Sequence, residues 1–421
     1  MITARYAREN IDAIRASLQK RRMEYDVDRL LKLDEEWRGL KTETQKLQEE
    51  RNRTSLEISE LKKRKSGQAD ALIGAMAEIK KGIEANEKKM SEYEADISKL
   101  LMGLPNTLHE SVPYGESGDD NVLVRTHGKP SARPNAKGHE EIATGLGMLD
   151  IERAAKVAGA RFYYLKGDLA LLDLSLTRFA IDMLSNKGFV PVIPPFMMRE
   201  EAYRGVTSLD DFEKVIYKSV SDEGTMKMIS TSEHPMAAMY MNEVLDKKDL
   251  PIKLAGISPC FRVEAGTHGK DTKGIFRVHQ FNKVEQFVFS RQEDSWRIFD
   301  ELIGNSEEIF KALGIPYRIV NICTGDIGIV AAKKYDLEGY MPVQGKYREL
   351  VSCSNCTDWQ SMRLDIKYDE GGKRKYVHTL NSTAIAVERT IVAIIENYAN
   401  DDGTITVPDA LAGYMGKRRI G

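Results

Sequence analysis

Apolar runs of membrane-spanning length are absent from this 421-residue sequence. None approaches the ~20 consecutive residues that a transmembrane helix needs, and the first residues, Met1 to Arg5, lack the apolar core of a signal peptide. Cysteine is also scarce, and four cysteines do not indicate a disulfide framework. Cys353 and Cys356 have the spacing of a metal-binding pair, but no second pair matches it, so we expect no zinc site. These absences predict a cytoplasmic protein with no membrane segment.

A large net charge is missing as well. The 62 Lys and Arg residues nearly balance the 64 Asp and Glu residues, which leaves a formal net charge of −2. Any nucleic-acid surface must therefore be a local patch rather than a property of the whole chain. The hydrophobic content of 42% is ample for a buried core, and the length allows two or three domains.

Two stretches in the first quarter of the chain repeat apolar residues in alternating steps of three and four. The first runs from Leu30 to Leu61 and the second from Leu72 to Leu104, on either side of a break at Lys65–Gln68. This heptad spacing predicts two long helices that pair as an antiparallel coiled coil, a projecting arm. Basic residues such as Arg51 and Lys62 would suit a phosphate backbone, although dimerisation is the commoner use of an arbitrary heptad hairpin.

A polar stretch follows the second heptad region. Residues Val112 to Lys137 contain proline and glycine and indicate a linker with early loops. We therefore place an arm domain at residues 1–111 and a second domain at 112–421. Within the second domain, the apolar and proline-rich segment Phe189–Pro195 predicts an edge strand that needs a partner, such as another subunit.

The second domain is predicted to be α+β. Helices are expected over Ile151–Ala158 and over Leu169–Lys187, the latter capped by Gly188. Strands such as Lys253–Arg262 and Val278–Phe289 are separated by loops rather than by regular helices. This order favours an antiparallel sheet flanked by helices.

A candidate hairpin, Phe261–Glu264 with Gly274–Glu285, concentrates charged and aromatic side chains. By strand alternation we expect five of them to converge: Arg262, Glu264, Arg277, Phe281 and Glu285. Arginine binds phosphate, a phenyl ring stacks on a purine and a carboxylate accepts hydrogen bonds from amino groups, so this is a candidate ATP site without a P-loop. A salt-bridged ladder is the ordinary alternative for one Arg–Glu pair. The polar loop 265–273 suits a mobile cover over a charged ligand.

A third segment lies near the C-terminus. The stripe Ile391, Ile394, Ile395 and Tyr398 predicts a helix, which places Arg389 in its first turn. The helix macrodipole disfavours a cation there, so we expect Arg389 to have an anionic ligand.

The three segments together resemble the motifs of class II aminoacyl-tRNA synthetases. Gly188–Pro195 is similar to motif 1, Phe261–Glu285 to motif 2 and Ala384–Arg389 to motif 3. The heptad arm in front of such a domain resembles the seryl-tRNA synthetase family, and the resemblance covers essentially the whole chain. Leu380–Thr383 is closer to archaeal members of that family.

The resemblance implies a role for each matching residue. The residues implied for the serine pocket are Thr231, Ser232, Glu233, Arg262, Glu285, Asn381 and Thr383. Those implied for ATP are Arg262, Val263, Glu264, Arg277, Val278, Phe281, Glu349, Leu350, Val351, Ser352 and Arg389. Glu349 and Ser352 would also hold Mg²⁺, which prefers oxygen ligands. Arg262 and Arg389 would be the catalytic residues, whereas His279 is expected to face away from Phe281 and to be structural.

The implied activity is ligation of serine to tRNA. The serine carboxylate would attack the α-phosphate of ATP, and the resulting seryl-adenylate would then acylate the 3′ end of tRNA(Ser). The resemblance also implies that tRNA(Ser) binds through the arm and the motif 2 loop, and that a homodimer forms through motif 1. Two alternatives remain: a paralogue that loads an amino acid onto a carrier protein, and a noncatalytic homologue. The arm argues against the first, and the retained motif arginines argue against the second.

Overall fold

The computed structural model describes residues 4–63, 69–208, 215–222, 224–264 and 273–421. The chain forms two compact units, Met1–Pro105 and Asn106–Gly421. The predicted boundary between residues 111 and 112 stays a prediction. Among the described residues, no helix is both long enough and apolar enough to cross a membrane.

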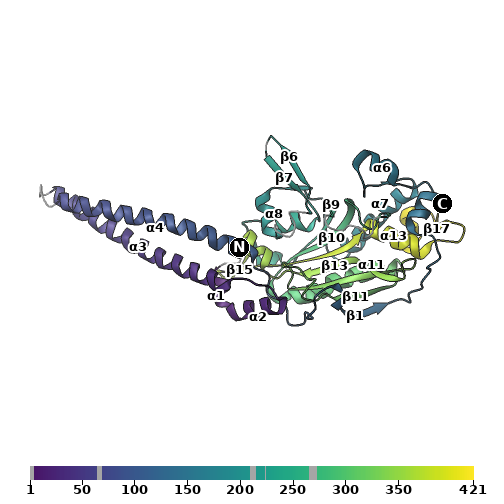
Figure 1. Cartoon of the computed structure of the whole chain (residues 1–421), viewed down its shortest axis with the longest axis horizontal. Helices are drawn as coiled ribbons and strands as arrows, with labels where there is room; N and C mark the ends of the chain where they lie inside the picture. The colour runs from purple at the N-terminus through teal and green to yellow at the C-terminus, as the bar shows by residue number, and fades with distance from the viewer. Residues whose placement is uncertain (1–3, 64–68, 209–214, 223, 265–272) are drawn as a thin grey trace. The chain divides into compact units, whose positions relative to one another are not determined.

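The first unit is entirely helical where it is described. Its elements are α1 (Ala4–Glu9), α2 (Ile11–Arg21), α3 (Val27–Lys63) and α4 (Ala69–Gly103). The two long helices run side by side (Figure 1).

Contacts between the long helices confirm the predicted antiparallel coiled coil. Trp37 Nε1 lies 3.0 Å from Glu94 Oε1, and Thr44 Oγ1 lies 3.9 Å from Met90 Sδ. As residue numbers increase along α3, the numbers of their contact partners in α4 decrease, so the two helices are antiparallel. The break predicted at 65–68 lies outside the described residues.

The second unit is built on an eight-stranded sheet. In spatial order the strands are β1 (Val122–His127), β11 (Tyr317–Asn321), β12 (Lys333–Met341), β13 (Lys346–Asn355), β16 (His378–Ala386), β10 (Gln280–Ser290), β9 (Ile252–Phe261) and β4 (Val190–Val192). All neighbours are antiparallel except β4 and β9. The predicted α+β class with an antiparallel sheet is confirmed, and the proline-containing β4 lies at an edge as expected.

In the described part of this unit, four small sheets accompany the large sheet, and helices such as α7, α11 and α13 lie beside it (Figure 1). The α-helices are α5 (His139–Gly145), α6 (Ile151–Ala158), α7 (Asp168–Ser185), α8 (Glu200–Val206), α10 (Glu233–Ala237), α11 (Ser295–Ala312), α12 (Trp359–Leu364), α13 (Val387–Tyr398) and α14 (Asp409–Met415). The small sheets pair β15 (Lys373–Tyr376), β14 (Lys367–Glu370) and β8 (Val244–Asp246); β5 (Met197–Met198), β7 (Gly224–Met228) and β6 (Lys218–Ser221); β2 (Leu149–Asp150) and β3 (Tyr164–Leu165); and β17 (Ile405–Thr406) and β18 (Arg419–Ile420).

Strand β10 is buried on both faces, and the two faces differ in chemistry. Val284 and Val288 belong to the main hydrophobic core, which packs the sheet against α7, α11 and α13. Phe287 and Phe289, on the opposite face, belong to a second core with α8 and α12. Because side chains alternate along a strand, Lys283 and Glu285 lie on the face of the second core. Phe281, near the start of β10, shares this parity, but its ring packs against residues of the main core.

Two sequence expectations need correction. The stretch from Val112 to Lys137 is not only linker, because Val122–His127 forms β1, an edge strand paired with β11. Its sequence has three apolar residues followed by three polar ones rather than the alternation that marks a half-buried strand, and all six residues are exposed. The helix predicted to reach Lys187 ends at Ser185, and Gly188 follows with φ of +82°. Ile151–Ala158 is helical over the predicted range.

Ile83 gives a direct test of the coiled-coil seam. Its side chain is 5% exposed, so Ile83→Asp buries an unpaired carboxylate and should destabilise the arm by about 3 kcal/mol. Leu56→Asp is the matched control, because Leu56 lies off the seam and is 71% exposed. Helical circular dichroism during denaturant unfolding should show an early loss for the Ile83 variant alone. Equal unfolding of both variants would contradict the assigned seam.

Candidate active site

The site residues lie on one face of the sheet, at positions set by the strand register. Phe281 pairs with Cys260 across β9, Lys283 with Ser258 and Glu285 with Gly256. On the other side of β10, Glu285 pairs with Thr383 of β16. Neighbouring strands thus bring residues that are distant in sequence to one face.

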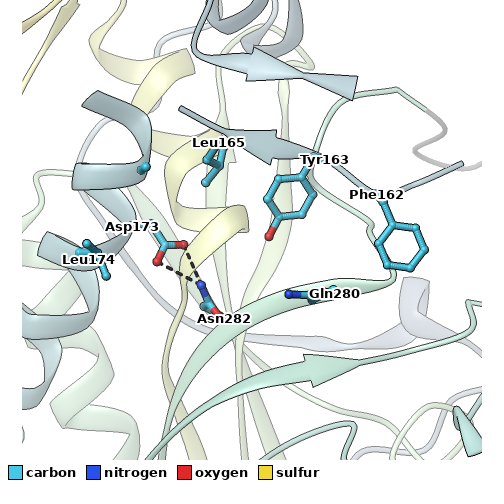
Figure 2. Close-up of a pocket in the computed structure, with 8 residues that line it drawn as sticks. Phe162, Tyr163, Leu165, Asp173, Leu174, Gln280 and Asn282 are labelled. Carbon is cyan, nitrogen blue, oxygen red and sulfur yellow. Dashed lines mark hydrogen bonds between the residues drawn. The ribbon is translucent and has the colours of Figure 1, made fainter. Parts of the chain in front are cut away.

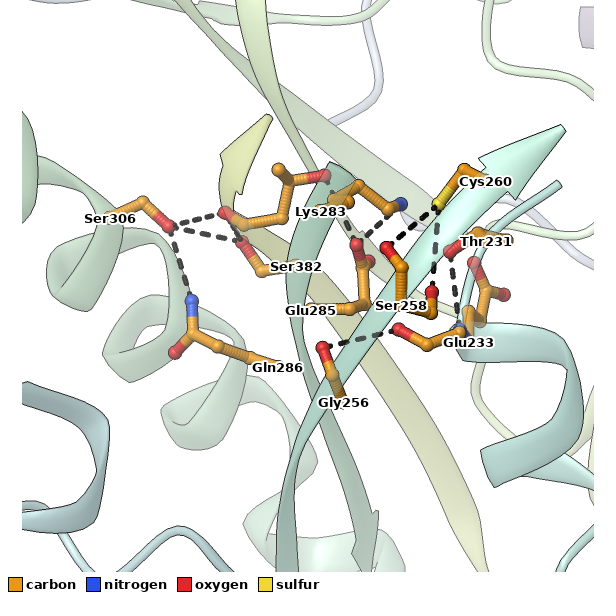
Figure 3. A network of polar contacts seen from close by, with 12 residues as sticks. Thr231, Glu233, Gly256, Ser258, Cys260, Lys283, Glu285, Gln286, Ser306 and Ser382 are labelled. Carbon is orange, nitrogen blue, oxygen red and sulfur yellow. Dashed lines mark hydrogen bonds and ion pairs between the residues drawn. The ribbon is translucent and has the colours of Figure 1, made fainter. Parts of the chain in front are cut away.

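An inner cluster forms at the middle of this face; its members are Thr231, Glu233, Lys283, Glu285, Asn381 and Thr383. Lys283 Nζ lies 2.5 Å from Glu285 Oε2, and both side chains are almost completely buried. Thr383 Oγ1 donates a hydrogen bond of 3.3 Å to the same carboxylate oxygen. Figure 3 shows this network and the neighbouring Thr231 and Glu233, which lie at the start of α10. The cluster therefore combines carboxylates, hydroxyls and one ammonium away from bulk water.

Glu233 is held by a side chain that the sequence did not suggest. Gln360 Nε2 donates to Glu233 Oε1 at 3.0 Å, and Gln360 Oε1 accepts from Thr379 Oγ1 at 2.7 Å. Burial and the nearby Glu285 carboxylate raise the pKa of Glu233 to about 7, against the opposing effect of Lys283. Glu233 is thus poised to become fully ionised when a cationic ligand arrives.

An outer cluster lies toward the ends of β9 and β10, with members Arg262, Glu264, Phe276, Arg277, Phe281, Glu349 and Arg389. Its cations are paired or stacked. Arg277 Nη1 lies 2.6 Å from Glu264 Oε2, and Arg389 Nη1 lies 3.4 Å from Glu349 Oε2 and donates to the Glu349 carbonyl at 3.0 Å.

Arg262 differs from the other two arginines. Its guanidinium lies over the Phe281 ring, 5.1 Å from the ring centroid, and among the described residues it has no carboxylate partner. Phe276, which sequence reasoning missed, is stacked by Arg389 at 5.0 Å and by Arg348 at 4.2 Å. The outer cluster therefore contains one uncommitted guanidinium beside an aromatic ring.

A small cavity lies within the outer cluster. It has a volume of about 20 Å³, which is room for about one water molecule. Its lining comprises Arg262, Glu264, Ile275, Phe276, Arg277, Val278, Phe281, Glu388 and Arg389. A nucleotide cannot fit until the paired side chains move apart, so phosphate oxygens would have to replace the carboxylates as partners of the arginines.

Carboxylates on β12 and β13 border the outer cluster. The Glu349 side chain is 49% exposed. Partial desolvation would raise its pKa, but Arg389, Lys334 and Arg262 outweigh that effect and hold the pKa at about 2. Burial and the Glu349 charge raise the pKa of Asp336. Glu349 is therefore ionised at neutral pH. A register shift between Leu337 and Glu338 re-aims the strand at this point.

Not every predicted ligand residue offers its side chain. Leu350 and Val351 are each 1% exposed and pack in the main core, so only their backbone is available. Ser232 is also buried, and its hydroxyl lies 3.4 Å from the Gly256 carbonyl. Val263 uses its N–H to bond the Val215 carbonyl at 2.8 Å, and Val278 lines the small cavity.

Strand alternation was the wrong reason for the convergence of the outer cluster. Strand β9 ends at Phe261 and β10 begins at Gln280, so Arg262, Glu264 and Arg277 lie beyond the strands. Glu264 has a left-handed φ of +50°, a conformation outside regular strand geometry, and its carboxylate contacts Arg277. His279 also precedes β10, so alternation does not orient it. Its Nδ1 lies 2.8 Å from the Arg262 carbonyl, and its ring packs against Phe162 and Tyr217 in a structural role. The predicted loop cover at 265–272 lies outside the described residues.

The four cysteines are free and buried. Burial raises the pKa of the Cys356 thiol well above its usual range and also raises that of Cys353, so both are protonated at neutral pH. Within the described part of the chain, no group of three or more His, Cys, Asp or Glu residues is arranged to hold a metal ion.

A second, larger cavity of about 340 Å³ lies on the other face of β10. It is lined by Phe162, Tyr163, Leu165, Ala170, Asp173, Leu174, Gln280 and Asn282. Figure 2 shows Asn282 bonded to both Asp173 oxygens, each at 3.1 Å. None of the described residues that line this cavity is a cation, so the lining is poorly suited to phosphate.

Glu388 lies between the two cavities. Its Oε2 accepts from the Asn282 N–H at 2.8 Å, and a hydrogen bond joins its Oε1 to the Tyr163 hydroxyl. Burial and the Asp173 carboxylate raise the pKa of Glu388 to about 8. Glu388 is therefore protonated at neutral pH and holds the start of α13, which carries Arg389, against β10.

Comparisons with known proteins agree with this architecture. Residues 1–108 match the model of the seryl-tRNA synthetase N-terminal domain, and residues 217–398 match that of the class II tRNA synthetase core domain for G, H, P, S and T. The chain is 51% identical to a serine–tRNA ligase of Methanoregula boonei, with all of both chains covered.

Two solved structures are also similar. One is a seryl-tRNA synthetase from Pyrococcus horikoshii complexed with ATP, with 49% identity, a TM-score of 0.94 and coverage of 100% of this chain and 99% of that one. The other is a cytoplasmic serine–tRNA ligase from Naegleria fowleri in complex with AMP, with 39% identity, a TM-score of 0.87 and coverage of 98% and 95%.

The protonated state of Glu388 predicts a pH-dependent stability. Between its usual pKa and about 8, the folded state keeps a proton that the unfolded state releases, so stability falls as pH rises. Glu388→Gln retains one hydrogen-bond donor and one acceptor but cannot titrate. In this variant the fall in the free energy of unfolding with rising pH should be smaller by a few kcal/mol. The measurement is the free energy of unfolding from pH 5 to 8.5. Glu308→Gln, a change at a surface ion pair, should leave the decline intact; identical slopes for wild type and Glu388→Gln would refute the assignment.

Proposed function

The chain belongs to the seryl-tRNA synthetase family of class II aminoacyl-tRNA synthetases, and from that premise we propose which of its residues perform each step. It is an ATP-dependent ligase that joins serine to tRNA. The observation that carries the residue assignment is the continuity of the inner and outer clusters along one face of β10. An amino acid in the first cluster would lie end to end with a nucleotide in the second.

The inner cluster takes serine. Glu233 receives the ammonium, and Glu285 and Thr383 bond the side-chain hydroxyl, with Thr231 and Asn381 completing the pocket. Their burial supports this, since Thr231, Glu285, Asn381 and Thr383 are each at most 6% exposed. A dry site that bonds a hydroxyl rejects alanine, because its own polar groups would lose their partners.

The outer cluster takes ATP. Phe281 stacks on adenine and Glu264 bonds its amino group, while Arg277 and Arg389 bind the distal phosphates in place of Glu264 and Glu349. Val263, Val278, Leu350 and Val351 would contribute backbone or apolar contacts. The two arginines are held near the site by their carboxylate partners, and these ion pairs must open before the guanidinium groups can bind phosphate.

Arg262 joins the two substrates. It has no carboxylate partner among the described residues and directly follows β9, in the outer cluster. It would hold the serine carboxylate against the α-phosphate. A serine carboxylate oxygen then forms a bond to phosphorus, and the bond to the bridging oxygen of pyrophosphate breaks. In the second step the terminal ribose hydroxyl of tRNA attacks the seryl carbonyl and AMP leaves. No side chain forms a covalent bond.

Mg²⁺ fits one border of the outer cluster. This ion is commonly held by one or two protein oxygens together with substrate phosphates, and Glu349 is ionised there, with Ser352 on the same strand. When bound, Mg²⁺ would neutralise phosphate charge. Glu349 and Ser352 would hold it, and Arg389 would bind phosphate beside it.

The two units suggest separate contacts for tRNA and for a second subunit. We assign tRNA(Ser) to the arm, residues 1–111, and to the motif 2 loop, and the chemistry to residues 112–421. A homodimer would form through motif 1, because Val190 and Ile193 at the β4 edge are 58% and 74% exposed and Leu174 of α7 is 65% exposed. Apolar patches of this kind mark subunit contacts. A cytoplasmic location remains our expectation.

Serine-dependent exchange of pyrophosphate into ATP tests the activation step. We expect exchange with serine and little with alanine, glycine or threonine. Arg262→Ala should lower the rate by on the order of 1,000-fold, the scale for removal of an electrostatic donor at a reaction centre. Arg291→Ala, which removes a surface arginine paired with Asp294, should have no effect. Preference for alanine or glycine would instead favour a carrier-protein paralogue, and no exchange by folded protein would indicate a noncatalytic homologue.

Removal of the arm separates the two steps. Deletion of residues 30–104 should leave serine-dependent exchange within about threefold of wild type, because no inner- or outer-cluster residue belongs to the first unit. Charging of tRNA(Ser) should be lost, since the deletion removes the proposed tRNA contact. The comparison uses exchange and aminoacylation assays on the same preparation. A parallel loss of both activities would show that the arm also serves adenylate formation.

A further inference from the structure

Lys283 is a buried cation that the assignment above leaves without a role. It lies on β10 between Phe281 and Glu285 and on the same face as both. Its side chain is 7% exposed, and its ammonium contacts the Glu285 carboxylate at 2.5 Å. Lysine is almost never buried without a partner, because an uncompensated charge is costly away from water. Lys283 lies in the middle of the β10 face that carries the inner cluster, which suggests that its burial serves the function of the site.

Glu285 has two oxygens, and Lys283 occupies one of them. Oε2 is contacted by Lys283 Nζ and by the Thr383 hydroxyl. Among the described residues, no hydrogen bond reaches Oε1. Figure 3 shows the Lys283 ammonium directed at the Glu285 carboxylate. The lysine therefore fixes the orientation of the carboxylate and leaves one oxygen for a ligand.

Lys283 also sets the charge of the inner cluster. The cluster contains two carboxylates, Glu233 and Glu285, which would repel each other if both were ionised without a cation. Burial and Glu285 raise the pKa of Glu233, and Lys283 is the strongest of the groups that oppose the rise. The same ammonium lowers the pKa of the buried His234 further, after burial itself. Its charge is thus felt across the pocket.

We propose that Lys283 is a positioning residue that determines amino-acid specificity by neutralising Glu285. The paired carboxylate then serves as an acceptor for the hydroxyl of the substrate, while Glu233 remains the carboxylate that binds the ammonium. Without Lys283 both carboxylates would compete for one ammonium, and the hydroxyl would lose its dedicated acceptor. This inference rests on the proposed assignment of serine to the inner cluster.

The test compares Michaelis constants in pyrophosphate exchange. Lys283→Met should raise KM for serine by on the order of 100-fold, as expected when a buried charge loses its partner, and should leave KM for ATP unchanged. The preference for serine over alanine should fall with it. Lys283→Arg, which keeps the charge, should retain much of the wild-type KM. Lys253→Met is the matched control, because Lys253 of β9 forms a 2.5 Å pair with Glu301 that belongs to neither cluster.

A double variant distinguishes charge balance from packing. Lys283→Met combined with Glu285→Gln restores neutrality, so its KM for serine should be lower than that of Lys283→Met alone. A double variant no better than the single one, or a loss in kcat with KM for serine unchanged, would overturn the proposal and place the ammonium on the reacting phosphate instead.

Two outcomes need separate readings. If Lys283→Met does not fold, the test rests on the double variant Lys283→Met with Glu285→Gln. Serine-dependent exchange by that variant would support the charge-balance proposal. Folded double variant without serine-dependent exchange would overturn the proposal. Wild-type protein without serine-dependent exchange would refute the proposed function, whereas wild-type exchange with an unchanged Lys283→Met would refute only the role of Lys283.

Discussion

Burial of both faces of β10 is the constraint on which the site depends. One face must be apolar because it packs against α7, α11 and α13, and Val284 and Val288 meet that need. The opposite face carries Phe281, Lys283 and Glu285. The first part of that face borders the proposed substrate pocket, and its later residues pack in the second core. Strand alternation separates these demands one residue at a time. A shift of one residue in register would bury the charged side chains in the apolar core and expose the valines to the pocket.

Most cations of the site are paired with a carboxylate before any ligand arrives. Arg277 is paired with Glu264, Arg389 with Glu349 and Lys283 with Glu285, whereas Arg262 has no such partner among the described residues. Paired groups are oriented by each other, so their alignment does not have to be created when substrate binds. The outer pairs can exchange partners because phosphate competes for arginine. The Lys283–Glu285 pair meets no anionic group in the serine side chain that could replace Glu285. The pair therefore stays intact and shapes the pocket.

Four glutamate carboxyl groups of the site differ in ionisation or in pairing because their neighbours differ. Glu349 is held ionised by three cations, with a pKa of about 2. Glu388, with Asp173 nearby and burial around it, has a pKa of about 8 and acts as a neutral hydrogen-bonding group. Glu233 lies between these cases at about 7. Glu285 is paired with a lysine. Composition cannot separate these roles, since the neighbours come from segments far apart in the chain.

Local periodicity and motif resemblance were sufficient to predict the heptad arm, the helix Ile151–Ala158, the edge position of β4, the α+β class and the family. They also named most residues of both clusters. Only the tertiary contacts show that Val122–His127 forms β1 within a stretch that was predicted to be linker and loop, that Gln360 holds Glu233, and that Phe276 lies between two arginines. The tertiary structure also placed Arg262, Glu264 and Arg277 beyond the ends of β9 and β10, next to Phe281 of β10 and Arg389 of α13. The reason is that these features depend on contacts across the sheet, where burial and partner charges are set by residues distant in sequence.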